Sequence, residues 1–194
     1  AAGAAGAAGA GGGAAAGGDG GSPGGGAPSS GPATGPAGPS ATVMLDQARA
    51  DLADRNYASA LSRAESVLQS LTTTSVRRGA LLVAGEAAYG TKDYVLASRH
   101  YGEFLSRNGH DPAAPQIALA LGWAQVRLGH VDSAQRTWAQ ISHVFPNDER
   151  APLGLLLSAQ AAVQAGDARA ARQWLDQLVK SYPSSPAAAV GRLS

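Results

Sequence analysis

The chain has 194 residues, a formal net charge of +1 and no cysteine. Without cysteine it has no disulfide framework, no thiolate metal site and no thiol nucleophile. Its 15 Lys and Arg residues form no run, so we do not expect the clustered basic face of a nucleic-acid-binding protein.

The first 40 residues are rich in Gly, Ala and Pro and contain no aromatic or branched aliphatic residue. Such a segment cannot bury a core, so residues 1–40 are predicted to be a disordered leader or linker. We expect it to act as a tether with a root-mean-square span of about 35 Å. Deleting residues 1–38 should therefore shift the melting temperature by no more than about 2 °C. Residues 41–194 are predicted to form the folded domain.

The folded part repeats itself every 37 residues. One column of the repeat is all alanine: Ala60, Ala97, Ala134 and Ala171. Twelve residues before each of these stands a small residue: Ala48, Gly85, Gly122 and Ala159. A third column is all leucine: Leu45, Leu82, Leu119 and Leu156. Columns that keep one phase over four units, without an insertion, indicate four structural repeats.

Each unit is predicted to form two helices. The first runs from the leucine column to a break such as Gly129-His130 or Gly166-Asp167. The second carries the alanine column, with apolar residues four and seven positions later that make one apolar face. Proline after Phe145 and Tyr182 ends the second helices of units three and four. The fold class is therefore all-α, a solenoid of four antiparallel helix pairs.

The residues of these units resemble the tetratricopeptide repeat. Unit three carries the resemblance best, with Leu121-Gly122, Ala134 and Phe145-Pro146, and the similarity covers about residues 42–183. It implies a non-catalytic interaction scaffold whose first helices line a concave groove. The usual period of that family is about 34 residues. We therefore expect the three extra residues at the end of each second helix or in the loop after it.

Lengthened units closed by Tyr-Pro-x-Ser-Pro, at residues 182–186, are similar to those of bacterial envelope proteins. These are the Tol–Pal-associated division coordinator, the tetratricopeptide lipoprotein of barrel assembly and the lipoproteins that activate penicillin-binding proteins. The resemblance implies a periplasmic or outer-membrane-associated scaffold in envelope assembly or division, and leaves open a membrane tether upstream of residue 1. The alternatives are a helical module of a larger envelope lipoprotein and a cytoplasmic tetratricopeptide adaptor.

The sequence offers no constellation for catalysis or for metal binding. None of the four histidines has a second histidine four residues away, and no H-E-x-x-H or G-x-S-x-G occurs. Asp93, His130 and Asp167 recur in one column and are interpreted as turn residues. We expect no catalytic residue, no cofactor, no metal and no transmembrane segment.

The candidate binding surface comes from the columns that tolerate polar residues. The column of Trp123 holds Arg, Glu and Gln in the other units, which indicates solvent exposure, and by resemblance it faces the groove. The candidate partner-binding residues are Arg49, Leu52, Glu86, Tyr89, Trp123, Val126, Arg127 and Gln160. Such a lining suits an amphipathic helix or an extended peptide. Trp138, in the apolar column of a second helix, is expected to be core.

The end of the chain is predicted to start a fifth first helix, because Leu193 lies 37 residues after Leu156. A helix that stops so early should cover little of the last unit. We therefore expect Trp174 and Leu178 to be partly exposed, and the native gene to continue.

Overall fold

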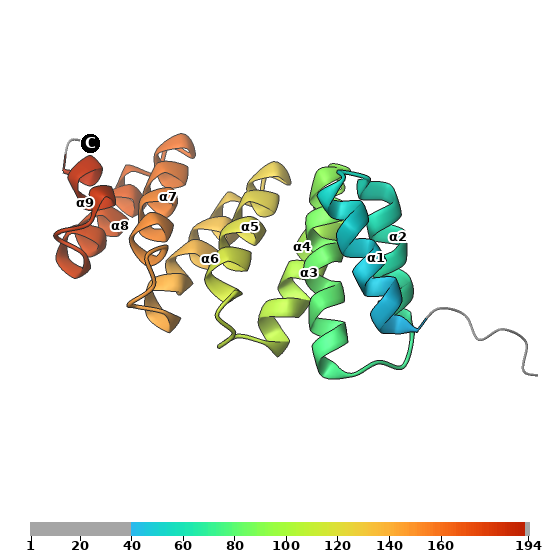
Figure 1. The fold of residues 1–194 in the computed structure, drawn as a ribbon. Helices are drawn as coiled ribbons and strands as arrows, with labels where there is room; N and C mark the ends of the chain where they lie inside the picture. The colour runs from blue at the N-terminus through green and yellow to red at the C-terminus, as the bar shows by residue number, and fades with distance from the viewer. Residues whose placement is uncertain (1–39, 193–194) are drawn as a thin grey trace, which may run out of the picture. The chain divides into compact units, whose positions relative to one another are not determined.

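The computed structural model describes residues 40–192, which contain nine helices and no strand (Figure 1). The helices are α1 (Ala41–Ala53), α2 (Tyr57–Gln69), α3 (Thr74–Gly90), α4 (Tyr94–Arg107), α5 (Ala114–Arg127), α6 (Val131–Val144), α7 (Ala151–Gln164), α8 (Ala168–Ser181) and α9 (Pro186–Gly191). Helix α1 begins directly after Ser40, whose hydroxyl accepts the Val43 N–H. The predicted leader before Ser40 lies outside the described residues.

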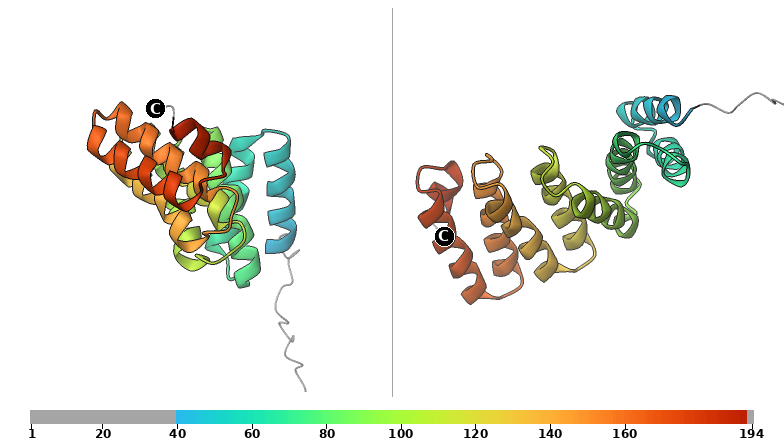
Figure 2. Two further views of the ribbon diagram at one scale, coloured as in Figure 1. Left: turned by 90° about the vertical axis from the view of Figure 1, so that its left-hand side faces the viewer. Right: turned by 90° about the horizontal axis from the view of Figure 1, so that it is seen from below.

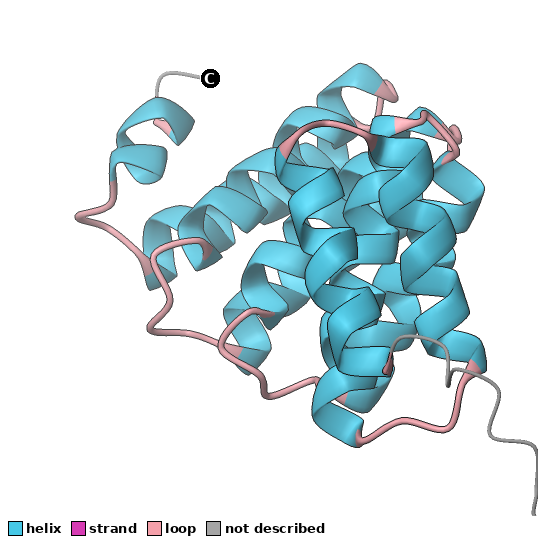
Figure 3. Ribbon diagram, turned by 45° about the vertical axis from the view of Figure 1, so that its right-hand side comes forward, coloured by secondary structure: helices cyan, strands magenta, loops and turns pink. Residues whose placement is uncertain are grey.

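Helices α1 to α8 form four pairs, and each pair packs on the next in chain order. Figures 1 and 2 show these pairs following one another in a row, with α1 at one end and α9 at the other. The connections are short loops at the two ends of the helices (Figure 3). The predicted α-solenoid of antiparallel helix pairs is confirmed, with the predicted pair boundaries.

The turn inside each pair has one geometry throughout. Its central residue has a positive φ in all four units: Arg55 at 61°, Lys92 at 66°, Gly129 at 77° and Gly166 at 78°. The next N–H reaches back to a carbonyl five residues earlier, as from Asn56 to Asp51 at 2.8 Å. This is a Schellman C-cap, for which glycine is the favoured residue. Arg55 and Lys92 hold it at a cost of about 1 kcal/mol or more, because their Cβ atoms crowd the backbone.

The aspartates after these turns cap the second helices. Asp93 accepts the Leu96 N–H at 3.0 Å and Asp167 accepts the Ala170 N–H at 2.9 Å. Both are turn residues, as the sequence predicts. His130 stands in the same column but makes no side-chain cap. An N-cap acceptor satisfies one of the free N–H groups of the first helical turn.

Within a pair, the small column of the first helix receives a large side chain from the second. A Cβ atom on Gly85 would lie 2.4 Å from the Tyr101 ring, and one on Gly122 would lie 2.0 Å from the Trp138 indole. Tyr101 and Trp138 occupy one column, whose other members are the smaller Ala64 and Leu175. Glycine therefore stands where the partner helix carries an aromatic residue, and alanine stands where it does not.

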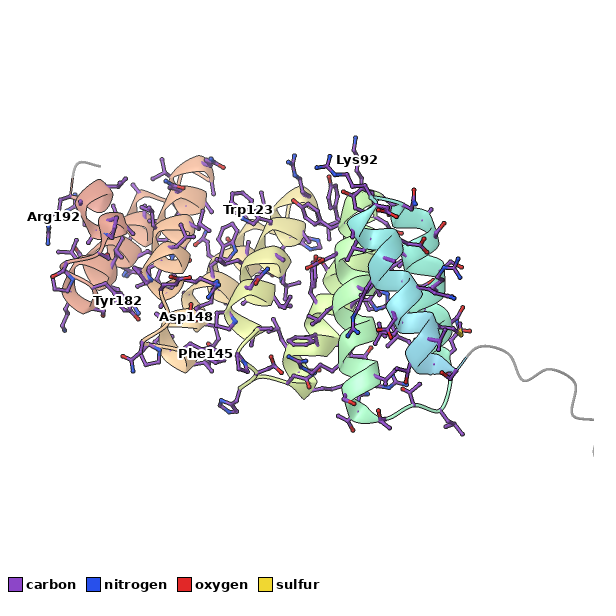
Figure 4. The ribbon with its side chains drawn as sticks, in the orientation of Figure 1. Lys92, Trp123, Phe145, Asp148, Tyr182 and Arg192 are labelled. Carbon is purple, nitrogen blue, oxygen red and sulfur yellow. The ribbon has the colours of Figure 1, made fainter. Side chains whose placement is uncertain are left out.

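The connections between pairs vary in length. Residues 70–73 and 182–185 are short loops, whereas residues 108–113 and 145–150 are longer. In the longer loops Asp111 accepts the Ala113 N–H and Asp148 accepts the Arg150 N–H, both at 2.8 Å. Figure 4 shows Asp148, Phe145 and Tyr182 at the lower end of the helices, and Lys92 at the upper end. The variable segments thus follow the second helices, where the sequence predicts the extra residues.

Helix α9 occupies the predicted position of a fifth first helix and packs on α7 and α8. Trp174 is half-buried, as expected, but the prediction for Leu178 is wrong because Leu178 is fully buried. Leu178 clusters with Ala188, and a Cβ atom on Gly191 would lie 3.4 Å from its Cδ2. Small residues bring this short helix close enough to cover the leucine. Leu193 lies outside the described residues.

Candidate partner-binding surface

The first predicted surface column is exposed in every unit. Its members project from α1, α3, α5 and α7: Arg49, Glu86, Trp123 and Gln160. The next column, one helical turn on, is half-buried at Leu52, Tyr89 and Val126. Its fourth member, Val163, is 62% exposed and was not among the predicted residues, although its position 37 residues after Val126 could have revealed it. We call these two columns the first-helix face.

Trp123 is the largest exposed side chain of this face, with 44% of its surface accessible. Its ring meets the ring of Trp138 edge-on, with centroids 5.2 Å apart and planes at 66°. Trp138 is only 1% exposed, and its Nε1–H donates to the Leu119 carbonyl at 3.0 Å. The prediction that Trp138 is core is confirmed. Trp123 is thus held on α5, near the middle of the row, by a fixed indole beneath it (Figure 4).

Three predicted residues come together at the α1–α3 end of the face. Leu52, Glu86 and Tyr89 line one hollow of about 340 Å³, together with Tyr57 and Tyr101. The carboxylate of Glu86 is partly desolvated by these walls, although the residue reaches solvent, and this desolvation raises the pKa of Glu86. Arg55 also lines the hollow, which therefore combines tyrosine and aliphatic side chains with one acidic and one basic residue.

A second hollow lies at the other end of the face, on α7 and α8. It measures about 530 Å³ and is lined by Gln160, Val163 and Leu175, with Leu156, Ala159 and Gln164. Of the predicted residues only Gln160 lies there. The two hollows and the Trp123 side chain are thus distributed along the face rather than gathered at one point.

The two predicted arginines lie apart from each other. Arg49 pairs with Asp46 at 2.9 Å, and its guanidinium covers Gly79 of α3, where a Cβ atom would lie 2.8 Å from Nη2. Arg127 is exposed at the last residue of α5. The first-helix face therefore carries Arg49 and Glu86 as single charges, Arg127 lies beside it, and these residues form no basic strip.

Other chemistry is sparse within residues 40–192. The described residues contain no group of three or more His, Asp or Glu side chains placed to hold a metal ion. None of their helices has both the length and the apolar character needed to cross a bilayer. His100 is buried between α2 and α4 with its Nε2 3.6 Å from Glu65 Oε1, and burial lowers the pKa of His100.

Comparison with known proteins identifies the class of fold. Residues 119–186 match the family model described as tetratricopeptide repeat, which spans units three and four. No curated protein matches the sequence. The arrangement of helix pairs over residues 40–192 is that of a tetratricopeptide-repeat solenoid.

Solved structures that share this arrangement include YrrB, PilW and PilF. YrrB, described as a TPR protein with an unusual peptide-binding site, aligns with a TM-score of 0.61 at 14% identity, over 80% of this chain and 75% of that chain. PilW, described as a type IV pilus biogenesis factor, aligns with a TM-score of 0.60 at 19% identity, over 80% of this chain and 68% of that chain. PilF of Pseudomonas aeruginosa aligns with a TM-score of 0.53 at 19% identity, over 79% of this chain and 66% of that chain. At such identities the similarity establishes the fold alone.

Proposed function

We propose that this protein is a non-catalytic scaffold that binds a peptide or helix of a partner protein on its first-helix face. The observation that carries the proposal is the contrast between neighbouring columns of the same helices. Ala48, Gly85, Gly122 and Ala159 are buried in all four units, whereas the column directly after them is exposed in all four. The exposed column holds Trp123 among polar residues, and the half-buried column one helical turn on holds Leu52, Tyr89 and Val126, so apolar side chains reach solvent in register along the solenoid.

The chemistry of the face suits a partner with spaced apolar side chains. Trp, Tyr and Arg dominate binding energy at protein interfaces, and all three occur here. Hollows at both ends and the Trp123 ring between them offer separate places for successive anchors of an amphipathic helix or extended peptide. YrrB, which has the same fold and is described as having a peptide-binding site, supports this use of the solenoid.

The test is replacement of Trp123 by alanine in the full chain. Trp123→Ala should weaken partner binding by about 2 kcal/mol, roughly thirtyfold. It should lower the free energy of unfolding by only about 1 kcal/mol, through the lost edge contact with Trp138. Binding is measured by pull-down from envelope extract and then by titration of the recovered partner.

Val95→Ala is the matched control, because Val95 is also an exposed apolar residue but lies on a second helix, α4. The control should bind the partner as the unaltered chain does. Equal binding by the unaltered chain, Trp123→Ala and Val95→Ala would refute the proposal. A loss of unfolding free energy in Trp123→Ala as large as that in Trp138→Ala would refute it as well.

We propose in addition that the scaffold works in the bacterial cell envelope, in the periplasm or at the outer membrane. Support comes from the lengthened units closed by Tyr182-Pro183 and from the likeness to PilF and PilW, the latter described as a pilus biogenesis factor. Fractionation of cells that express the native gene tests this. Recovery in the periplasmic or membrane fraction supports it, and recovery in the cytosol favours the cytoplasmic adaptor. A mass larger than 19.3 kDa would favour a module of a larger lipoprotein.

A further inference from the structure

A recess opens where the loop after α2 meets the start of α3 and the end of α4, at the lower end of the helices in Figure 1. Three arginines line it: Arg77 and Arg78 from α3, and Arg107 from α4. The space measures about 410 Å³, and its other lining residues are Thr72, Thr74, Leu81 and Asn108. We call it the arginine recess.

The repeat forms the same recess at the next joint without a charged residue. There the three arginine positions, 37 residues on, are Ala114, Pro115 and Val144, and all three line an apolar hollow of about 280 Å³ between α4, α5 and α6. One unit further the same positions hold Ala151, Pro152 and Ser181. The packing of the helix pairs therefore does not account for three guanidinium groups at the joint between units one and two.

The charge of one of the three arginines is already balanced. Arg78 donates two hydrogen bonds to the carboxylate of Asp111, one of them from Nη2 at 2.7 Å. Its guanidinium also lies 5.9 Å from the ring centre of Phe104. Arg78 is thus a fixed part of the wall, and its charge is used within the chain.

The other two arginines share a single carboxylate. Arg107 Nε donates to Glu103 Oε1 at 3.0 Å, and Arg77 Nη1 lies 3.6 Å from the same oxygen. Arg77 Nη2 donates to the Leu68 carbonyl at 2.8 Å. Within residues 40–192, Arg77 Nε and Nη1 and both Nη atoms of Arg107 donate no hydrogen bond. Two guanidinium groups with one carboxylate leave one positive charge and several N–H donors unpaired at the recess.

The remaining walls add two hydroxyl groups that are also unpaired within residues 40–192. Thr72 Oγ1 is buried without a hydrogen-bond partner, and the Thr74 hydroxyl makes no hydrogen bond. Asn108, in contrast, uses its side-chain N–H to donate to the Phe104 carbonyl at 3.0 Å. An unpaired buried hydroxyl is unfavourable, so a ligand with acceptor oxygens would suit this wall as well as the arginines.

We propose that the arginine recess binds the carboxylate of an acidic side chain from a partner protein. Charge complementarity selects an anion, because three guanidinium groups face only the two carboxylates of Glu103 and Asp111. A carboxylate carries the single negative charge that balances the excess. Glu103 already places one carboxylate oxygen against both Arg77 and Arg107, and guanidinium groups bind carboxylates through charge-assisted hydrogen bonds.

The arginine recess is separate from the first-helix face. Arg77 stands in the first turn of α3 and Tyr89 in its last turn, which places them about 18 Å apart along the helix axis. The hollow lined by Glu86 and Tyr89 therefore lies at the other end of this helix. A partner bound at the recess leaves the first-helix face free.

The experiment titrates the full chain with a tetra-aspartate peptide whose two ends are blocked, and follows backbone amide signals by nuclear magnetic resonance. We expect saturable shifts at Thr74, Arg77 and Arg107. The affinity should fall as the salt concentration rises, because salt screens the attraction between exposed charges. The matching tetra-asparagine peptide should cause no shifts at these amides.

Two variants should change the affinity in opposite directions. Arg107→Gln removes an exposed guanidinium and should weaken peptide binding roughly fivefold, the upper range for an exposed ion pair. Glu103→Gln removes the carboxylate that competes for Arg77 and Arg107, so it should strengthen binding roughly twofold to fivefold. Arg172→Gln is the matched control, since Arg172 is an exposed arginine of another second helix, α8. It should bind the peptide as the unaltered chain does.

Several results would overturn the inference. Unchanged binding by Arg107→Gln, or weaker binding by Glu103→Gln, would mean that these residues only stabilise the joint. Equal binding of the asparagine peptide would remove the role of charge. Tighter binding of inorganic phosphate than of the peptide would assign the recess to a phosphate group. Shifts that vanish in Trp123→Ala would place the peptide on the first-helix face, which would overturn the inference and leave the proposed function intact.

Discussion

The joint between units two and three differs from the joint between units three and four. At the later joint Gly154 lets α7 lie directly on α6, because even a Cβ atom there would come within 2.5 Å of the Trp138 carbonyl oxygen. At the earlier joint the same column holds Ile117, which is buried between α4 and α5. The repeat sets the path of the chain, and side-chain size in a few columns sets how closely successive units approach.

The loops at the two joints also make different ion pairs. Asp111 receives two hydrogen bonds from Arg78 of α3, one of them at 2.7 Å from Nη2, and this guanidinium lies 5.9 Å from the Phe104 ring centre. Asp148, in the same column, pairs with Arg150 only two residues away at 3.3 Å. The earlier joint thus has a long-range ion pair where the later one has close helix packing.

Trp138→Ala should have the largest effect, because the buried Trp138 ring fills the third pair against Gly122. We expect a loss of about 3–5 kcal/mol in the free energy of unfolding, through the cavity that remains. Chemical denaturation measures it, with Trp123→Ala as the exposed counterpart. A loss of less than about 1 kcal/mol would mean that the pair does not depend on this ring.

Gly154→Val tests the close joint directly. The valine must displace backbone rather than the end of a flexible side chain, so we expect a loss of about 1–3 kcal/mol or more. Gly102→Ala is the matched control on α4, where a Cβ atom would meet nothing within 4 Å. The control should gain up to about 1 kcal/mol from helix propensity. Similar melting temperatures for both variants would remove the distinction between the joints.

Lys92→Gly tests the turn inside unit two, which precedes the earlier joint, between units two and three. We call this the looser joint, because Ile117 stands there in place of Gly154. Lys92 holds a φ of 66°, whereas the later pairs have glycine in this position. The substitution should raise the free energy of unfolding by about 1 kcal/mol, since glycine adopts this conformation without a Cβ clash. Gly166→Ala should lower it by a similar amount. The melting temperature should therefore rise in Lys92→Gly and fall in Gly166→Ala. A lower melting temperature for Lys92→Gly would contradict the prediction.

The ion pair of the earlier joint should give the smallest effect, because Arg78 is partly exposed. Arg78→Met should cost about 0.2–1 kcal/mol near pH 7, and Arg150→Met at the later joint should cost less. The hydrogen bond from Arg78 lowers the pKa of Asp111 below its ordinary value. The contribution is therefore present above the unfolded-state pKa of about 3.9, and is lost as the pH falls through the folded-state pKa. The free energies of unfolding of the unaltered chain and of Arg78→Met should therefore approach each other as the pH falls from 7 to 3.

The sequence alone allowed prediction of the helix pairs, the turns and the core position of Trp138, because these follow from residue type at a fixed spacing. It also predicted which first-helix columns reach solvent, although whether partners bind there stays a prediction. The hollow of about 280 Å³ between α4, α5 and α6 was not predictable in this way. Its walls include Ala118 and Thr137, which only the packing of the helices brings to one place. Leu178 was predicted wrongly because α9, although short, covers it with small residues.

The looser joint has a consequence for how the chain folds and opens. The main contacts of each helix in residues 40–192 are with the next helix in the chain or the next but one, so contacts stay within neighbouring repeats, and chains of this kind can start to fold at several points. Opening events begin where neighbouring repeats hold each other least. We expect α1–α4 and α5–α9 to behave as two cooperative blocks, with amide hydrogen exchange in one block proceeding while the other stays protected.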